Sequence, residues 1–92
     1  MRNYCNYRDM QAEIQNAREF VGNSVTAYRV GDLYVIKSYS TVIAMWGNGR
    51  QAMNVCKYSM TTSKLQNIIR RAWGKVEEFE SERELLKSFD KF

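Results

Sequence analysis

The segment from Lys57 to Trp73, KYSMTTSKLQNIIRRAW, gathers residue types that are suited to holding an anion. A helix is expected to start inside it, and the first turn of a helix presents unpaired backbone amides and a partial positive charge. Hydroxyl and ammonium groups beside those amides can complete a site for a phosphate or a carboxylate. The candidate anion site comprises Ser59, Thr61, Thr62 and Ser63, with Lys57 and Lys64 next to it. The simpler alternative is an ordinary helix cap, which requires only one of these hydroxyls.

A row of basic and amide side chains follows along the same predicted helix. Lys64, Asn67, Arg71 and Lys75 recur at steps of three and four residues, which places them on one helical face, with Gln66 and Arg70 beside them. Such a face can follow a phosphate backbone while its amides contact base edges. The alternative is a solvated face, although a solvated face usually mixes charges of both signs. The candidate binding residues are therefore Lys57, Lys64, Asn67, Arg70, Arg71 and Lys75.

Positive charge is concentrated in the middle of the chain. The 92 residues carry a net charge of +4, but residues 29–75 hold eight basic residues and a single carboxylate, Asp32. Residues 76–92 instead hold six acidic and three basic residues. This distribution suits contact with phosphate groups or with an acidic protein surface.

Aromatic and basic residues also alternate along the predicted strands, namely Tyr28, Arg29, Tyr34, Lys37, Tyr39, Trp46 and Arg50. Nucleic-acid bases can stack on a sheet that carries such residues. Packing within the protein is the alternative that we favour, because aromatic side chains are common in strands.

Several kinds of catalytic and metal site are excluded by composition. The chain contains no His, so it cannot by itself build a Ser–His–Asp or Cys–His catalytic site. Its two cysteines, Cys5 and Cys56, are far apart in sequence and cannot complete a zinc site alone. We read both as inert or packing residues, and we expect a protein that is not an enzyme and uses no cofactor or metal.

The location of the protein is expected to be cytoplasmic. The first ten residues, MRNYCNYRDM, lack the apolar core of a signal peptide, and two cysteines do not make a disulfide framework. The longest apolar run, Thr41–Trp46, is too short to span a bilayer, so no membrane partner is expected.

The pattern of hydrophobic residues predicts one small α+β domain over residues 1–92. A first helix is capped by Asp9 and carries its apolar stripe to Val21. Turn residues then separate four predicted strands, Ser24–Val30, Leu33–Tyr39, Thr41–Trp46 and Gln51–Tyr58. We expect an antiparallel meander, with Met53 and Val55 facing the core.

Two further helices are predicted after the strands. One begins near Thr61 or Thr62 and ends at Gly74, and the other lies within Phe79–Phe92, where Ser81 and Glu84 match a capping box. The expected architecture is a four-stranded antiparallel sheet, with the N-terminal helix and both C-terminal helices packed on one face. A chain this short has a modest core, so a homodimer is also expected as a way to bury more surface.

Part of this sequence resembles a known group of proteins. NSVTAYRVGDLYVIKSYSTVIAMW, followed by KYSMTTSKLQNIIRRAW, is similar to a family of small uncharacterised proteins carried by phages and plasmids. The resemblance spans about residues 23–73 and rests on Tyr58-Ser59, Thr61-Thr62-Ser63-Lys64, Gln66 and Arg70-Arg71-Ala72. The usual member has His before the Gln of this Tyr-Ser-x-Thr-Thr-Ser-Lys-x-Gln motif, where this chain has Leu65. The resemblance implies a mobile-element product that acts inside a bacterial cell, without a role for that imidazole.

Charge and resemblance together lead to one expected function and one alternative. We expect a non-enzymatic binding protein that inhibits a host defence system, as anti-CRISPR proteins do, by docking its basic face on a nucleic-acid-handling protein or nucleoprotein effector. The alternative is direct, weakly sequence-specific binding of DNA or RNA, which weakens steeply with salt because released counterions drive it.

Overall fold

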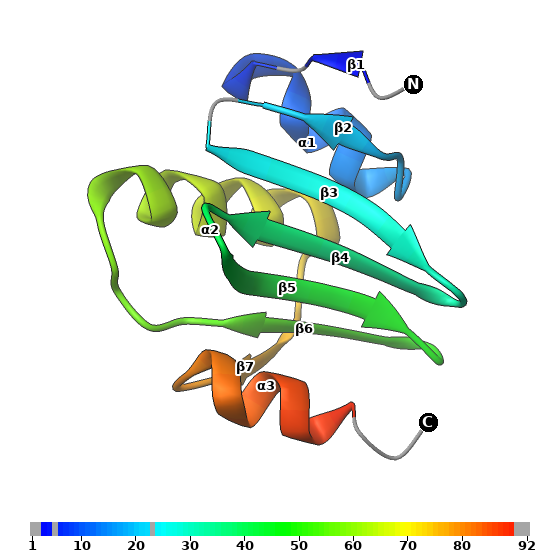
Figure 1. Ribbon diagram of the computed structural model, residues 1–92, viewed down its shortest axis with the longest axis vertical. Helices are drawn as coiled ribbons and strands as arrows, with labels where there is room; N and C mark the ends of the chain where they lie inside the picture. Colours follow the sequence, from blue (N-terminus) through cyan, green and yellow to red (C-terminus); the bar gives the residue numbers. More distant parts are fainter. Residues whose placement is uncertain (1–2, 5, 23, 90–92) are drawn as a thin grey trace.

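The computed structural model describes residues 3–4, 6–22 and 24–89 and shows an α+β fold (Figure 1). Within these residues, three helices accompany one seven-stranded sheet. In chain order the elements are β1 (Asn3–Tyr4), α1 (Tyr7–Gln15), β2 (Phe20–Val21), β3 (Val25–Val30), β4 (Leu33–Ser38), β5 (Thr41–Gly47), β6 (Arg50–Asn54), α2 (Met60–Trp73), β7 (Glu77–Phe79) and α3 (Glu82–Ser88).

The sheet contains the predicted meander but is larger and mixed. Strands β2 to β6 are antiparallel neighbours, and β3 to β6 correspond to the four predicted strands. Strand β1 pairs with β2 in parallel, and β7 pairs with β6 in parallel. The prediction of a purely antiparallel sheet with only four strands is therefore wrong. The added strands are two or three residues long and leave no alternating pattern in the sequence.

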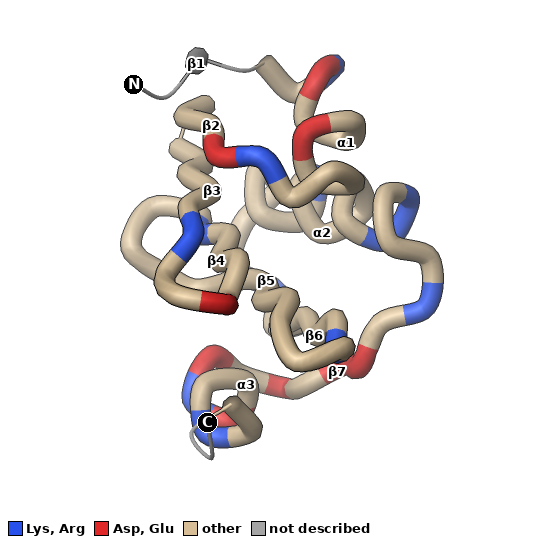
Figure 2. Tube along the Cα trace, turned by 90° about the vertical axis from the view of Figure 1, so that its right-hand side faces the viewer, with Lys and Arg blue, Asp and Glu red and all other residues tan. Residues whose placement is uncertain are grey.

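The helices cover both faces of the sheet, which corrects the predicted packing on one face. Helices α1 and α2 pack on one face, where Met10, Ile14, Leu65, Ile68 and Ile69 meet Ile36, Ile43 and Met53. Helix α3 packs on the other face, where Leu85 and Phe89 meet Val35, Val42, Met45 and Ala52. Figure 2 shows α2 and α3 on opposite sides of β6. The chain changes face because β7 lies beside β6 before α3 begins.

The first helix is shorter than predicted. Asn6, rather than Asp9, is its N-cap, and the Asn6 side chain accepts a hydrogen bond from the Asp9 backbone amide at 3.3 Å. Ala17 adopts a left-handed conformation with φ of 51°, which ends the helical path. Phe20 then enters β2 opposite Ala27 and is fully buried. The predicted helical stripe up to Val21 is therefore wrong beyond α1.

The ends of the other two helices agree with the sequence. Ser59 caps α2 by accepting from the Thr62 amide at 3.2 Å, and Gly74 follows the helix with φ of 73°, as predicted. Ser81 caps α3 by accepting from the Glu84 amide at 3.2 Å. Strand β6 ends earlier than the predicted Tyr58, so the chain has five residues in which to turn from the sheet into α2.

Trp73, the last residue of α2, contacts both α1 and the sheet. The Trp73 indole N–H donates to the Ile14 carbonyl oxygen at 3.0 Å, which joins the end of α2 to α1. The Trp73 ring also meets Trp46 of β5 edge-on, with ring centroids 5.6 Å apart. The hydrogen bond to Ile14 holds the C-terminal end of α2 beside α1.

Candidate functional site

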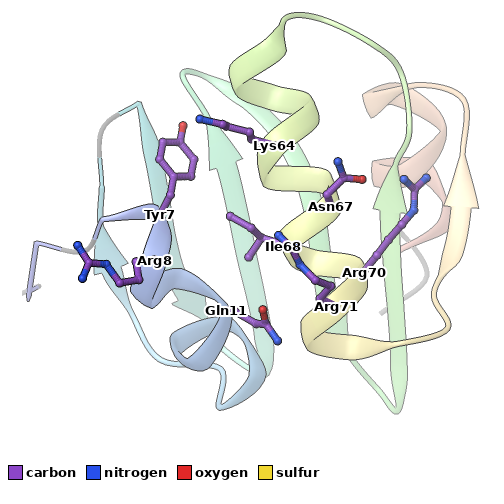
Figure 3. Close-up of a pocket in the computed structure, with 8 residues that line it drawn as sticks. All are labelled: Tyr7, Arg8, Gln11, Lys64, Asn67, Ile68, Arg70 and Arg71. Carbon is purple, nitrogen blue, oxygen red and sulfur yellow. The ribbon is translucent and has the colours of Figure 1, made fainter.

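A groove of about 690 Å³ runs between α1 and α2 on the outer side of the protein. Its lining combines cations, amides and two apolar side chains, namely Tyr7, Arg8, Gln11, Lys64, Asn67, Ile68, Arg70 and Arg71 (Figure 3). The groove therefore brings together four of the six binding residues predicted from sequence.

The cations of this groove do not all point inward. Figure 3 shows Lys64 extending towards Tyr7 of α1, and the Lys64 Nζ lies 5.6 Å from the centre of the Tyr7 ring. Arg71 lies along the α2 wall, whereas Arg8 and Arg70 point away from the space between the helices. Lys64 and Arg71 are therefore the central charges of the groove, and Arg8 and Arg70 flank it.

No carboxylate among the described residues lines this groove. Within the described part of the chain, ion pairs join Arg18 to Glu13, Arg50 to Glu77 and Arg70 to Glu78. Arg70 is thus partly neutralised, with its guanidinium 3.3 Å from the Glu78 carboxylate. The charges of Lys64 and Arg71 have no such partner within the described residues, so the groove favours an anion.

A second hollow, of about 450 Å³, continues this groove past the start of α2. It shares Lys64 and Asn67 with the first and adds Lys57, Tyr58, Ser59, Met60 and Ser63. The two hollows form one continuous surface, which we call the basic groove. It contains Lys57, Lys64, Asn67, Arg70 and Arg71 of the predicted binding residues.

Lys75 lies apart from the basic groove. Its predicted place in the row required the helix to continue, but α2 ends at Trp73 and Gly74 turns the chain. Lys75 instead lines a separate hollow with Arg50 and Glu77. The row of cations is therefore one residue shorter than the spacing indicated.

The four hydroxyls of the candidate anion site have different environments. Ser59 is the helix cap, and its hydroxyl also lies 3.2 Å from the Thr62 hydroxyl. Thr62 is buried and hydrogen-bonds Ser38 of β4 at 3.2 Å. Ser63 lines the basic groove, and Thr61 is half-exposed outside it. The structure therefore does not gather these hydroxyls around one anion position, and two of them stabilise the helix start.

Gln66 also takes a structural position instead of facing a partner. It is buried, and its Nε2 donates to the carbonyl oxygens of Asn54 at 2.8 Å and Cys56 at 3.0 Å. Asn54 in turn donates to the Tyr58 hydroxyl at 2.9 Å and accepts from the Cys56 amide at 2.9 Å. These bonds hold the turn from β6 into α2, so Gln66 cannot read a base edge from here.

The α1 side of the groove was missed by reasoning from the sequence. Tyr7, Arg8 and Gln11 lie about fifty residues before α2, and no spacing rule links the two segments. The available signal was the polar side of the first amphipathic helix, which carries Arg8 and Gln11 three residues apart. Only the packing of α1 on α2 shows that this side faces the basic row.

The described residues show no cluster of three or more His, Cys, Asp or Glu side chains arranged to hold a metal ion. Cys56 has a free, half-buried thiol, and Cys5 lies outside the described residues. No helix in the described part of the chain is both long and apolar enough to cross a lipid bilayer.

Comparison with known proteins assigns the chain to a family. The model of a family of unknown function, DUF8033, matches residues 9–86. The chain belongs to this family. The DUF8033 match begins at Asp9 inside α1 and ends at Leu86 inside α3, so it includes all of α2, while Tyr7 and Arg8 of the basic groove lie before it. No curated protein matches the chain, and no solved structure matches it.

Proposed function

We propose that this DUF8033 protein is a non-enzymatic binding module that holds an anionic part of a macromolecular partner in the basic groove. The observation that carries the proposal is the pair of central cations, Lys64 and Arg71, in a groove without a lining carboxylate among the described residues. A cation that has no internal partner retains its charge for a ligand, and a concave wall concentrates its field.

The partner that this surface fits best is an acidic protein surface. The groove continues into exposed apolar side chains, Tyr58 and Met60, beside Lys57. Tyr, Met and Arg are enriched at protein interfaces, whereas a surface that only follows phosphates does not need an exposed Met. The sequence resemblance to proteins of mobile elements supports the wider setting, in which the partner is a nucleic-acid-handling effector of a host defence system that this protein inhibits.

Direct binding of DNA or RNA is the second candidate. It is favoured by the combination of groove cations with two amides, Gln11 and Asn67, which can contact phosphates and base edges. This candidate predicts affinity that falls steeply with salt. The first candidate predicts a complex that remains after nucleic acid is removed.

The test compares two variants that reverse one charge each. Arg71→Glu changes a central groove charge, and Lys75→Glu makes the same change outside the groove. Each tagged protein is used to purify partners from bacterial cells that carry defence systems, with and without nuclease, and its affinity for duplex and single-stranded oligonucleotides is measured at low salt.

We expect Arg71→Glu to weaken partner binding by about tenfold or more, while Lys75→Glu changes it by less than about twofold. A partner that persists after nuclease treatment supports a protein contact. Binding that is lost with nuclease, together with oligonucleotide affinity that depends on Arg71, supports the second candidate. Equal effects of the two variants would show that the basic groove is not the contact surface.

A further inference from the structure

An exposed apolar patch adjoins the basic groove at the start of α2. Met60 is 88% exposed, Tyr39 is 68% exposed and Tyr58 is 47% exposed. Tyr58 and Met60 line the same hollow, and Tyr39 and Tyr58 line the next one. In Figure 1 the turn between β4 and β5 lies at the same end of the sheet as the start of α2. We call these three side chains the apolar patch.

The backbone conformation of Tyr39 indicates that a tyrosine is not needed to form the turn between β4 and β5. Tyr39 has φ of 56°, a left-handed conformation that is costly for a bulky aromatic residue and is usual for Gly or Asn. Burial of the ring does not offset this cost, because most of the Tyr39 side chain is exposed. Folding alone thus favours a different residue at this position.

The hollow between Tyr39 and Tyr58 has a volume of about 270 Å³. Its floor includes the hydroxyls of Ser38, Thr62 and Ser59, which hydrogen-bond one another at 3.2 Å. Because these hydroxyls already have partners, the floor does not require a polar ligand. The hollow is below the usual size of a small-molecule site and fits a single apolar or aromatic side chain between two tyrosines.

We propose that the partner presents an acidic protein segment with one large apolar side chain, which docks on the apolar patch while neighbouring carboxylates occupy the basic groove. The charges are complementary, since Lys57 and Lys64 line the hollow that contains Met60, and Arg71 follows beyond Lys64. This inference rests on the proposed function and specifies the chemistry of the partner.

The observation that favours a protein segment over nucleic acid is Met60. Its flexible thioether lies almost fully in solvent in a hollow that Lys57 and Lys64 also line, where it gains from contact with an apolar side chain. Stacking of bases uses flat rings, and the most exposed side chain of the patch, Met60, offers none.

The test uses two short synthetic peptides and one oligonucleotide. The first peptide consists of glutamates around one central Phe, the second replaces that Phe by Ala, and the third probe is a single-stranded oligothymidylate. Fluorescence anisotropy measures each affinity for the wild-type protein and for Tyr39→Asn, Met60→Ala and Arg71→Glu. Val30→Ala is the matched control, because Val30 is also an exposed apolar residue, at 56%, and lies on β3 outside the patch.

We expect the Phe peptide to bind wild-type protein about fivefold or more tightly than the Ala peptide. This ratio should fall to about one in Tyr39→Asn and Met60→Ala and stay unchanged in Val30→Ala. Tyr39→Asn separates binding from folding, because Asn tolerates the left-handed turn and should keep or raise the melting temperature.

Three results would overturn the inference. If both peptides bind equally and Arg71→Glu weakens both, the groove function stands and the apolar anchor is wrong. If only the oligonucleotide binds, and it depends on Arg71, the occupant is nucleic acid. If no probe binds, neither the anchor nor the acidic occupant of the groove survives.

Discussion

The side chain of Gln66 provides a test of how the β6–α2 junction is stabilised. Gln66 is 5% exposed, and its Nε2 donates to the carbonyl oxygens of Asn54 and Cys56. We propose the change Gln66→Met, because Met is unbranched and similar in size but has no N–H donor. The substitution therefore removes both hydrogen bonds while leaving most of the packing in place.

The expected loss of stability follows from these two bonds. Each hydrogen bond contributes about 1 kcal/mol net, and a buried carbonyl that loses its donor costs about 1–3 kcal/mol. The Asn54 carbonyl lies in a fully buried residue, whereas Cys56 is half-buried and water can reach it more easily. Gln66→Met should therefore lower the free energy of unfolding by about 2–4 kcal/mol. For a domain of this size, that lowers the melting temperature by roughly 10–25 °C.

Urea denaturation followed by circular dichroism measures this effect, with Asn67→Met as the control. Asn67 is the next residue on α2 but is exposed in the groove, so its change should alter stability by less than about 0.5 kcal/mol. Gln66→Glu adds a pH test, because a protonated carboxyl can donate to one carbonyl and an ionised one cannot. A Gln66→Met protein as stable as Asn67→Met would refute the structural role of Gln66.

Two predictions concern the acidic segment around β7. Glu78→Gln removes the carboxylate that competes for Arg70, so anionic probes should bind about two- to fivefold more tightly in anisotropy measurements, and an unchanged affinity would show that Arg70 takes no part. Arg50 lowers the pKa of the Glu77 carboxyl through a side-chain hydrogen bond, so this pair stabilises the fold at neutral pH and loses its effect as the pH falls below the ordinary value of 4.5. At neutral pH, Glu77→Gln should lower the free energy of unfolding by up to about 1 kcal/mol, because the pair is partly exposed to solvent. In urea titrations this difference from wild type should shrink between pH 6 and pH 3. A difference that stays constant with pH would argue against the ion pair.

Local patterns predicted the elements that are regular and long. The four central strands and the span of α2 follow from β-branched runs, tight turns and helical spacing, and Gly74 ends α2 as its backbone freedom indicates. Phe20 shows where such patterns fail, because an apolar residue at that position fits both a continued helix and a strand. In the structure, the left-handed turn at Ala17 ends the helical path, and Phe20 enters a strand instead. This arrangement buries Phe20 completely in the core, which is a tertiary contact that the local sequence does not reveal. Strand β7 lies beyond prediction because it is only three residues long, two of which, Glu77 and Glu78, have low strand propensity, and it depends on pairing with β6.

The candidate site was predicted on one side only, for the same reason. Spacing on a helix relates residues within one turn of each other, so it places Lys64 and Arg71 together. It contains no information about which distant helix packs beside them. The contact of Trp73 with Ile14 supplies that information, and with it the second wall of the groove.

The residues on which the family resemblance rests divide into a group that stabilises the fold and a group that faces the basic groove. Ser59, Thr62 and Gln66 build the turn into α2 through caps and buried hydrogen bonds, whereas Lys64 and Arg71 face the groove. One short segment thus both starts the helix and directs its cations. A variant of the first group can abolish binding simply by releasing α2 from β6, so loss of binding in it identifies no contact. Only variants that keep the melting temperature and lose affinity, such as those at Arg71 and Tyr39, can assign the binding surface.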